Sequence, residues 1–165
     1  MLHVGDIVTI DRQPNIPLGE SGRVMVPTSY LGKPMVITII DTTSGVCKYK
    51  FHGVRNGQPH WLEEDLTLVE PASKRPLFGI GDRVRAVDIY RVLVAHTSDA
   101  IQATTCITVD TTMTIVGVEM RLTDYIYILK PDECLDARFY DSEGQPPLLL
   151  ASQSILARAS DYTLF

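Results

Sequence analysis

The feature that most constrains this chain is a set of short sequence landmarks that occurs twice in the same order. Turns favour Gly, Asp and Pro in any β-rich chain, so one recurring turn residue would mean little. Several recurrences in register indicate either one structural plan used twice or a shared demand for turn residues. The landmarks, each with its second copy, are Val4-Gly5-Asp6-Ile7-Val8 with Ile80-Gly81-Asp82-Arg83-Val84, Asp41-Thr42-Thr43 with Asp110-Thr111-Thr112, and Gly57-Gln58-Pro59 with Gly144-Gln145-Pro146.

The boundary between the two halves is predicted at residues 71–76, a polar stretch bracketed by prolines that is typical of a short, stiff linker. The linker separates a first domain, residues 1–70, from a second, residues 77–165. The first 75 residues hold 8 basic and 8 acidic residues, and the remainder holds 7 and 12. The net charge of −5 therefore comes from the second half, and it disfavours a protein that binds nucleic-acid phosphates through a basic excess.

The hydrophobic pattern has a period of two residues rather than 3.6, which predicts short β-strands. Clusters of Gly, Pro, Asn and Asp separate these runs, as expected for turns. Many short strands at this spacing predict an all-β protein built from small barrels or a sandwich. The candidate strands are 6–10, 23–26, 35–40, 46–51, 83–87, 91–95, 105–109, 114–120, 125–130 and 137–140, with single helical turns at 63–66 and 151–154.

The first half resembles the small SH3-like barrels of many bacterial and phage proteins. The resemblance rests on a Gly-Asp turn before the first strand, a Gly-x-x-Gly-x-Val turn at 19–24, and a Trp followed by an acidic turn and a short strand at 61–69. In the second half the Gly-Asp turn is present, but the Gly-x-x-Gly turn and the Trp are not. The resemblance implies two tandem SH3-like small barrels, the second one elaborated by an extra β-hairpin.

Four residues of the first half have structural roles in this interpretation. Gly5 and Gly22 are expected where a tight strand entry favours positive φ. Asp6 can accept backbone hydrogen bonds at its turn. Trp61 is expected to cap the open end of a small core.

The extra hairpin is predicted at about residues 113–130. Strict alternation would place Thr114, Val116 and Val118 on one of its faces. Such a long apolar hairpin either packs between the two barrels or offers an edge and a face to a partner. We therefore expect Tyr125, Tyr127 and the C-terminal tail with Phe165 to contact a protein partner.

The sequence contains no catalytic, cofactor-binding or metal-binding motif. The Gly-x-Ser-x-Gly and phosphate-binding Gly-x-x-x-x-Gly-Lys patterns are absent, as are Cys-x-x-Cys and His-x-x-x-His. Cys47, Cys106 and Cys134 are an odd number without close spacing, which favours reduced thiols in a cytoplasmic, reducing compartment. No apolar run approaches the roughly 20 residues that cross a membrane.

These observations predict a non-enzymatic structural or docking subunit that binds protein surfaces in a larger assembly. The resemblance suggests a phage virion component, such as a capsid-decorating or connector protein, as its setting. An alternative is an accessory factor of transcription or translation that contacts polymerase, ribosome or RNA through one barrel. That alternative expects Arg83, Arg85 and Arg91 to form one exposed patch. A third class, an enzyme or enzyme subunit, expects a polar pocket with strongly shifted pKa values.

Overall fold

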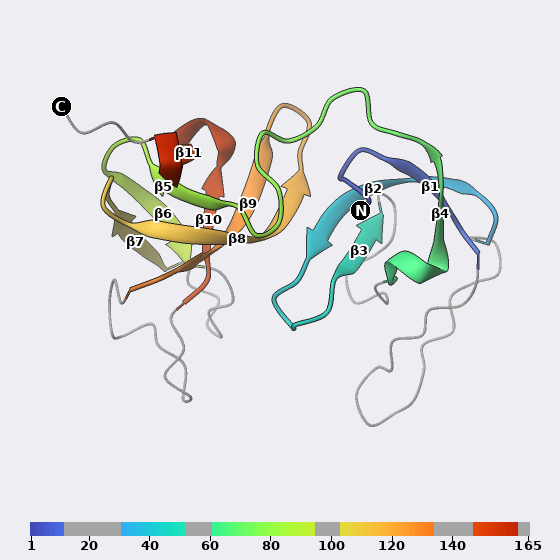
Figure 1. Cartoon of the computed structure of the whole chain (residues 1–165), viewed down its shortest axis with the longest axis horizontal. Helices are drawn as coiled ribbons and strands as arrows, with labels where there is room; N and C mark the ends of the chain where they lie inside the picture. Colours follow the sequence, from blue (N-terminus) through green and yellow to red (C-terminus); the bar gives the residue numbers. More distant parts are fainter. Residues whose placement is uncertain (12–30, 52–60, 95–102, 134–146, 162–165) are drawn as a thin grey trace. The chain divides into compact units, whose positions relative to one another are not determined.

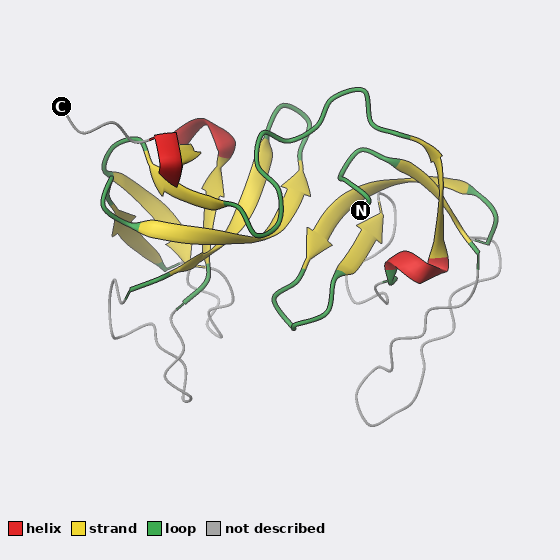
Figure 2. Ribbon diagram, viewed as in Figure 1, coloured by secondary structure: helices red, strands yellow, loops and turns green. Residues whose placement is uncertain are grey.

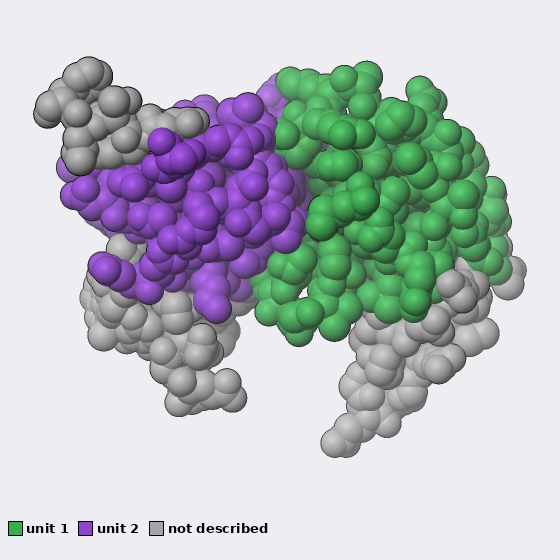
Figure 3. Space-filling model, in the orientation of Figure 1, with its two compact units in different colours: residues 1–76 green, residues 77–165 purple. Residues whose placement is uncertain are grey.

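The fold is all-β, as predicted from the period of two. The computed structural model describes residues 1–11, 31–51, 61–94, 103–133 and 147–161. Within these ranges the secondary structure is antiparallel strands joined by turns and single 3-10 turns (Figure 2). The chain divides into two compact units, residues 1–76 and 77–165, which are coloured separately in Figure 3.

The first unit pairs its strands in the order β4-β1-β2-β3. Trp61 then makes an isolated bridge to Tyr49 of β3, just before the chain enters the 3-10 turn that precedes β4. The described strands pair as an open sheet, and the SH3-like barrel stays a prediction. The elements, labelled in Figure 1, are β1 (Ile7–Ile10), β2 (Pro34–Asp41), β3 (Lys48–Phe51), η3 (Glu63–Asp65) and β4 (Leu66–Glu70).

The core of the first unit is filled by alternate residues of these strands. Val8 and Ile10 are fully buried, whereas Ile7 and Thr9 are half-buried on the opposite side of β1. Trp61 is also fully buried and packs edge-on against Phe51, with ring centroids 5.1 Å apart. The indole thus fills the core beside the strand that it bridges.

The second unit pairs its strands in the order β11-β5-β8-β9-β10-β6-β7 (Figure 1). Its core is formed by the inward residues of every strand, with Phe78 from the segment before β5. The elements are β5 (Arg83–Ala86), β6 (Tyr90–Val94), β7 (Thr104–Ile107), β8 (Thr112–Met120), β9 (Tyr125–Pro131), β10 (Leu149–Ser152), η5 (Gln153–Ile155), β11 (Leu156–Arg158) and η6 (Ala159–Asp161).

The two units share the turn that precedes their first strand. Gly5 and Gly81 both have positive φ, 90° and 88°. The N–H of Gly5 donates to the carbonyl of Ile37 at 2.8 Å, and the N–H of Gly81 donates to that of Ile115 at 2.8 Å. Because L residues with a Cβ rarely adopt this conformation, each turn has a physical reason for its glycine.

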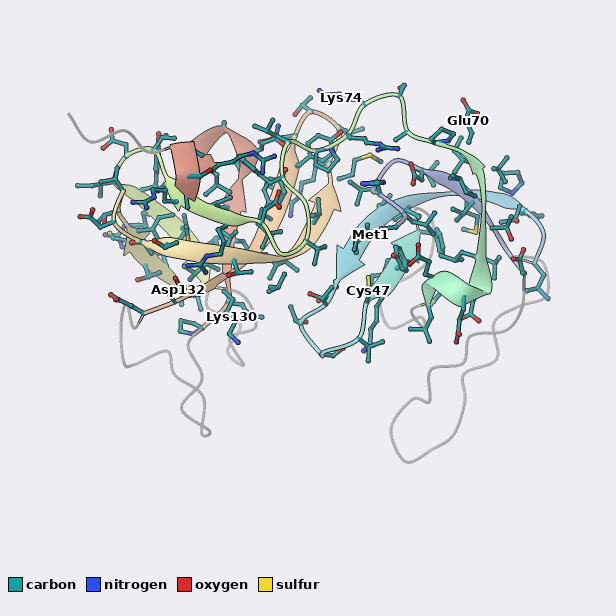
Figure 4. The ribbon with its side chains drawn as sticks, viewed as in Figure 1. Met1, Cys47, Glu70, Lys74, Lys130 and Asp132 are labelled. Atoms are coloured by element: carbon teal, nitrogen blue, oxygen red, sulfur yellow. The ribbon has the colours of Figure 1, made fainter. Side chains whose placement is uncertain are left out.

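The carboxylates of Asp6 and Asp82 hold these turns closed. Each accepts a hydrogen bond from the backbone N–H three residues earlier, at 2.8 and 2.9 Å. Their other contacts differ: Asp6 also accepts from the N–H of Ala72 at 2.8 Å, and Asp82 accepts from Nη1 of Arg158 at 3.2 Å. The buried Asp6 therefore anchors the start of the connecting segment, which Figure 4 marks by Glu70 and Lys74.

The predicted hairpin at 113–130 is present as β8 and β9, and the first unit has a counterpart for it. The order β1, β2, β3, η3, β4 corresponds to β5, β8, β9, η5, β11. Each unit thus contains such a hairpin, and the second unit also carries β10 between β9 and η5. The tandem barrels with an extra hairpin stay a prediction. Between β5 and β8 the second unit carries β6 and β7, a stretch whose counterpart lies largely outside the described residues.

The faces of β8 differ from those that strict alternation predicts. The register of β8 on β9 shifts between Ile115 and Gly117, so Val116 is an extra residue in the ladder. Before this β-bulge Thr114 faces outward, and after it Val118 faces the core. Because one extra residue reverses the alternation, the prediction that Thr114 and Val118 share a face was wrong.

Candidate protein-binding surface

The central strands of the second unit have apolar side chains on both faces. An antiparallel sheet that covers a core on one side normally alternates apolar and polar residues. In β9 the inward residues Tyr125, Tyr127 and Leu129 are buried, yet the residues between them are Ile126 and Ile128. This pattern is typical of a strand that is covered on both sides.

We call the outward apolar side chains the outer apolar face of the second unit. Leu93 on β6 is 38% exposed, and Ile126, Ile128 and Leu150 are half-buried. Single apolar side chains on a surface are ordinary, but a contiguous group marks an interaction site. The members of the outer apolar face are Leu93, Ile126, Ile128 and Leu150.

The register of three neighbouring strands makes this face continuous. Leu150 of β10 lies directly opposite both Ile128 of β9 and Leu93 of β6. Ile128 in turn lies opposite Gly117 of β8, where an added Cβ would sit 2.6 Å from the Cδ1 atom of Ile128. The missing side chain at Gly117 therefore provides the space that the Ile128 side chain occupies.

Charged groups of opposite sign flank the outer apolar face. Glu119 lies on β8 in register with the outward side of β9, and Asp124 reaches this side because its Oδ2 accepts a hydrogen bond from Oγ of Ser152 at 2.5 Å. Arg91 lies on β6, two residues before Leu93 and therefore on the same face. The acidic groups are thus on the β8–β9 side and the basic group is on the β6 side.

The two tyrosines predicted to contact a partner belong to the core instead. Tyr125 is 6% exposed and Tyr127 is fully buried. Alternation along β9 places both tyrosines on the inward side of the strand, whereas Ile126 and Ile128 are on its outward side. We therefore assign Tyr125 and Tyr127 a packing role, and the isoleucines between them take their place in the candidate surface.

Tyr127 links three segments of the second unit. Its ring packs edge-on against Phe78 at 5.6 Å, its hydroxyl donates to Oε1 of Gln153 at 2.6 Å, and it accepts from the N–H of Phe78 at 3.2 Å. Oε1 of Gln153 also accepts from the N–H of Leu77 at 2.8 Å. Burial raises the pKa of Tyr127 to about 12, because the phenolate would be desolvated.

The three arginines of the alternative function each have a contact within the second unit. Arg83 and Arg85 share a face of β5. Arg85 donates from Nη1 to the carbonyl of Val109 at 3.4 Å, and Arg91 donates from Nη1 to Oγ1 of Thr104 at 3.1 Å. These contacts place the two guanidinium groups at the ends of β7.

Arg83 is paired with Asp132 at the end of β9, near Lys130 (Figure 4). Nη1 and Nη2 of Arg83 both donate to the carboxylate, and Nη1 also donates to Oγ1 of Thr114 at 2.7 Å. The hydrogen bond from Arg83 lowers the pKa of Asp132, and the same bond raises the pKa of Arg83. The charge of Arg83 is therefore matched within the unit.

Two of the predicted residues, Gly22 and Phe165, lie outside the described residues. So do His52 and His60, which follow Cys47 in the sequence. Within the described ranges there is no group of three or more His, Cys, Asp or Glu side chains that could hold a metal ion. Of the helical turns in those ranges, none is long and apolar enough to cross a membrane.

Comparison with known proteins gives one partial match. Residues 16–43 match the family described as "Putative transposon-encoded protein (DUF2080)". Its second part, from residue 31 onward, runs through β2, and its first part lies outside the described residues. No curated protein and no solved structure matches the chain.

Proposed function

We propose that this protein is a non-enzymatic docking or structural subunit that binds a protein surface in a larger assembly. The observation that carries the proposal is the unbroken row of Leu93, Leu150 and Ile128 on the outward side of the second unit. Covering these side chains removes apolar area from water at roughly 25 cal/mol per Å². A phage virion, with this chain as a capsid-decorating or connector subunit, is the setting that the SH3-like resemblance suggests.

The alternative, an accessory factor of nucleic-acid machinery, has less support. Phosphate binding requires cationic groups that are free to meet an anion. The charge of Arg83 is already matched by Asp132. The unpaired thiol of the exposed Cys106 supports the proposal that the protein works in a reducing compartment or inside a virion.

The test is co-purification of the tagged chain from its native lysate, with and without nuclease. The parent is compared with Leu93→Asp, which places a charge in the outer apolar face. The matched control is Leu122→Asp, because Leu122 is fully exposed at the β8–β9 turn and lies outside this face. We expect one abundant protein to co-purify with the parent and the control, independently of nuclease, and to be lost with Leu93→Asp.

Two results would contradict the proposal. Equal recovery of the same protein with Leu93→Asp would show that the outer apolar face is not the contact. Loss of all partners after nuclease treatment would move the protein to nucleic-acid machinery, and Arg85 and Arg91 would then be the residues to change.

A further inference from the structure

We propose that a second copy of this chain covers the outer apolar face, so that the protein forms a two-fold dimer by packing sheet on sheet. This inference rests on the proposed function, because it names the partner of the same surface. Most soluble oligomers are homo-oligomers with closed symmetry, and two-fold dimers are the commonest class. In such a dimer the same surface of both copies must be complementary to itself.

The arrangement of the strands meets this condition for the apolar centre. Across the outer face the strands follow the order β8, β9, β10, β6. A two-fold axis parallel to the strands and between β9 and β10 exchanges β9 with β10 and β8 with β6. Leu150 of one copy then faces Ile128 of the second copy, since the two residues are in register. Aligned sheets pack in this way at crossing angles of about 30°.

The same axis also pairs the charges that flank the face. Glu119 on β8 of one copy comes opposite Arg91 on β6 of the second copy, and symmetry repeats this pair. Among the described residues, Glu119 has an exposed ion pair with Arg121, at 3.5 Å, and such pairs contribute little to stability. Arg91 is exposed and donates a hydrogen bond to Thr104 from Nη1, which occupies one of the five N–H donors of its guanidinium.

The symmetric placement of the charges favours a second copy over an unrelated protein. Glu119 and Arg91 have opposite charges and lie on strands equally far from the proposed axis. A two-fold dimer requires opposite charges at such positions, because equal ones would meet and repel. An unrelated partner imposes no relation between the two flanks.

The first experiment measures the mass of the purified chain by sedimentation equilibrium over a range of concentrations. We expect the parent and Leu122→Asp to show the same concentration-dependent dimer. Leu93→Asp should be monomeric throughout, because a buried carboxylate would replace an apolar side chain of the outer apolar face. Its circular dichroism and the fluorescence of Trp61 should match those of the parent, which shows that both units stay folded. A parent that is monomeric at every concentration would overturn the inference.

The second experiment reverses the two charges. Glu119→Arg and Arg91→Glu should each raise the dissociation constant of the dimer by about tenfold, because each places like charges opposite one another. The double variant restores opposite charges and should return the constant to within a few-fold of the parent. If the double variant instead raises the dissociation constant by the product of the two single effects, the result contradicts the proposed pairing.

The two proposals fail in different ways. A monomeric parent whose native partner is lost with Leu93→Asp would refute the dimer while supporting docking of another protein at this face. A dimer that survives Leu93→Asp, with unchanged recovery of the partner, would refute both proposals.

Discussion

Removal of the Tyr127 hydroxyl tests how the core of the second unit is held together. Tyr127→Phe keeps the ring and its edge-on contact with Phe78, so no cavity forms. It deprives the buried N–H of Phe78 of its acceptor and Oε1 of Gln153 of one donor. Leaving a buried polar group without its partner costs about 1–3 kcal/mol, and we expect the free energy of unfolding to fall by this amount.

Tyr49 provides a matched control from the first unit. Both tyrosines are fully buried, and burial raises the pKa of both hydroxyls. The hydroxyl of Tyr49 lies beside the thiol of Cys47, a weak hydrogen-bonding group, and within the described part of the chain it has no oxygen or nitrogen partner. Tyr49→Phe should therefore leave stability unchanged or raise it by up to about 1 kcal/mol.

The assay is urea unfolding followed by circular dichroism, with amide hydrogen exchange of Phe78 as a local measurement. We expect Tyr127→Phe to lower the midpoint and speed the exchange of the Phe78 amide, while Tyr49→Phe does neither. We reason that the loss in free energy of unfolding depends on the hydrogen-bond partners of the hydroxyl and not on burial alone. An equal loss in the two variants, or unchanged exchange of the Phe78 amide, would refute this reasoning.

Three further predictions concern single groups of the second unit. The pKa of Tyr127 is about 12 in the folded state against about 10 in the unfolded state. The stability that the neutral phenol provides is therefore complete below pH 10 and falls by roughly 3 kcal/mol as pH rises from 10 through 12. This loss should be absent from the alkaline denaturation of Tyr127→Phe. Gly81→Ala, at φ 88°, should destabilise by about 1–2 kcal/mol in thermal unfolding, whereas Gly79→Ala, without positive φ, should cost less than half as much. NMR titration should place the pKa of Asp132 below its ordinary value, so that the ion pair with Arg83 is present at neutral pH and is lost as pH falls. Arg83→Gln should raise the pKa of Asp132. An unchanged titration midpoint of Asp132 in this variant would count against the pairing.

Local chemistry explains why much of the fold was predictable. The period of two predicted β1, β2, β3 and the strands β5 to β9 close to their observed bounds, because each strand has one side on a core. The one-turn helix before β4 and the glycine at Gly5 followed from residues a few positions apart. Such features depend on neighbours in the sequence, and so the sequence contains their signal.

The candidate surface was not found from the sequence, although part of its signal was present. The run at residues 148–150 is three consecutive leucines, and Ile126 and Ile128 alternate with two tyrosines. Both patterns indicate strands with apolar side chains on either side. An aromatic residue and an isoleucine can each occupy a core or a surface, so the sequence did not say which side of β9 faces inward.

The amino-acid sequence by itself determined that the chain is all-β and where its tight turns lie, because alternation and turn chemistry act over a few residues. Only the tertiary structure decided which side of each strand is buried. The β-bulge at Val116 reverses the faces of β8, and the pairing of β10 with both β9 and β6 brings Leu150 beside Ile128 and Leu93. These outcomes depend on strand order and register, which long-range pairing sets and no short stretch of sequence encodes.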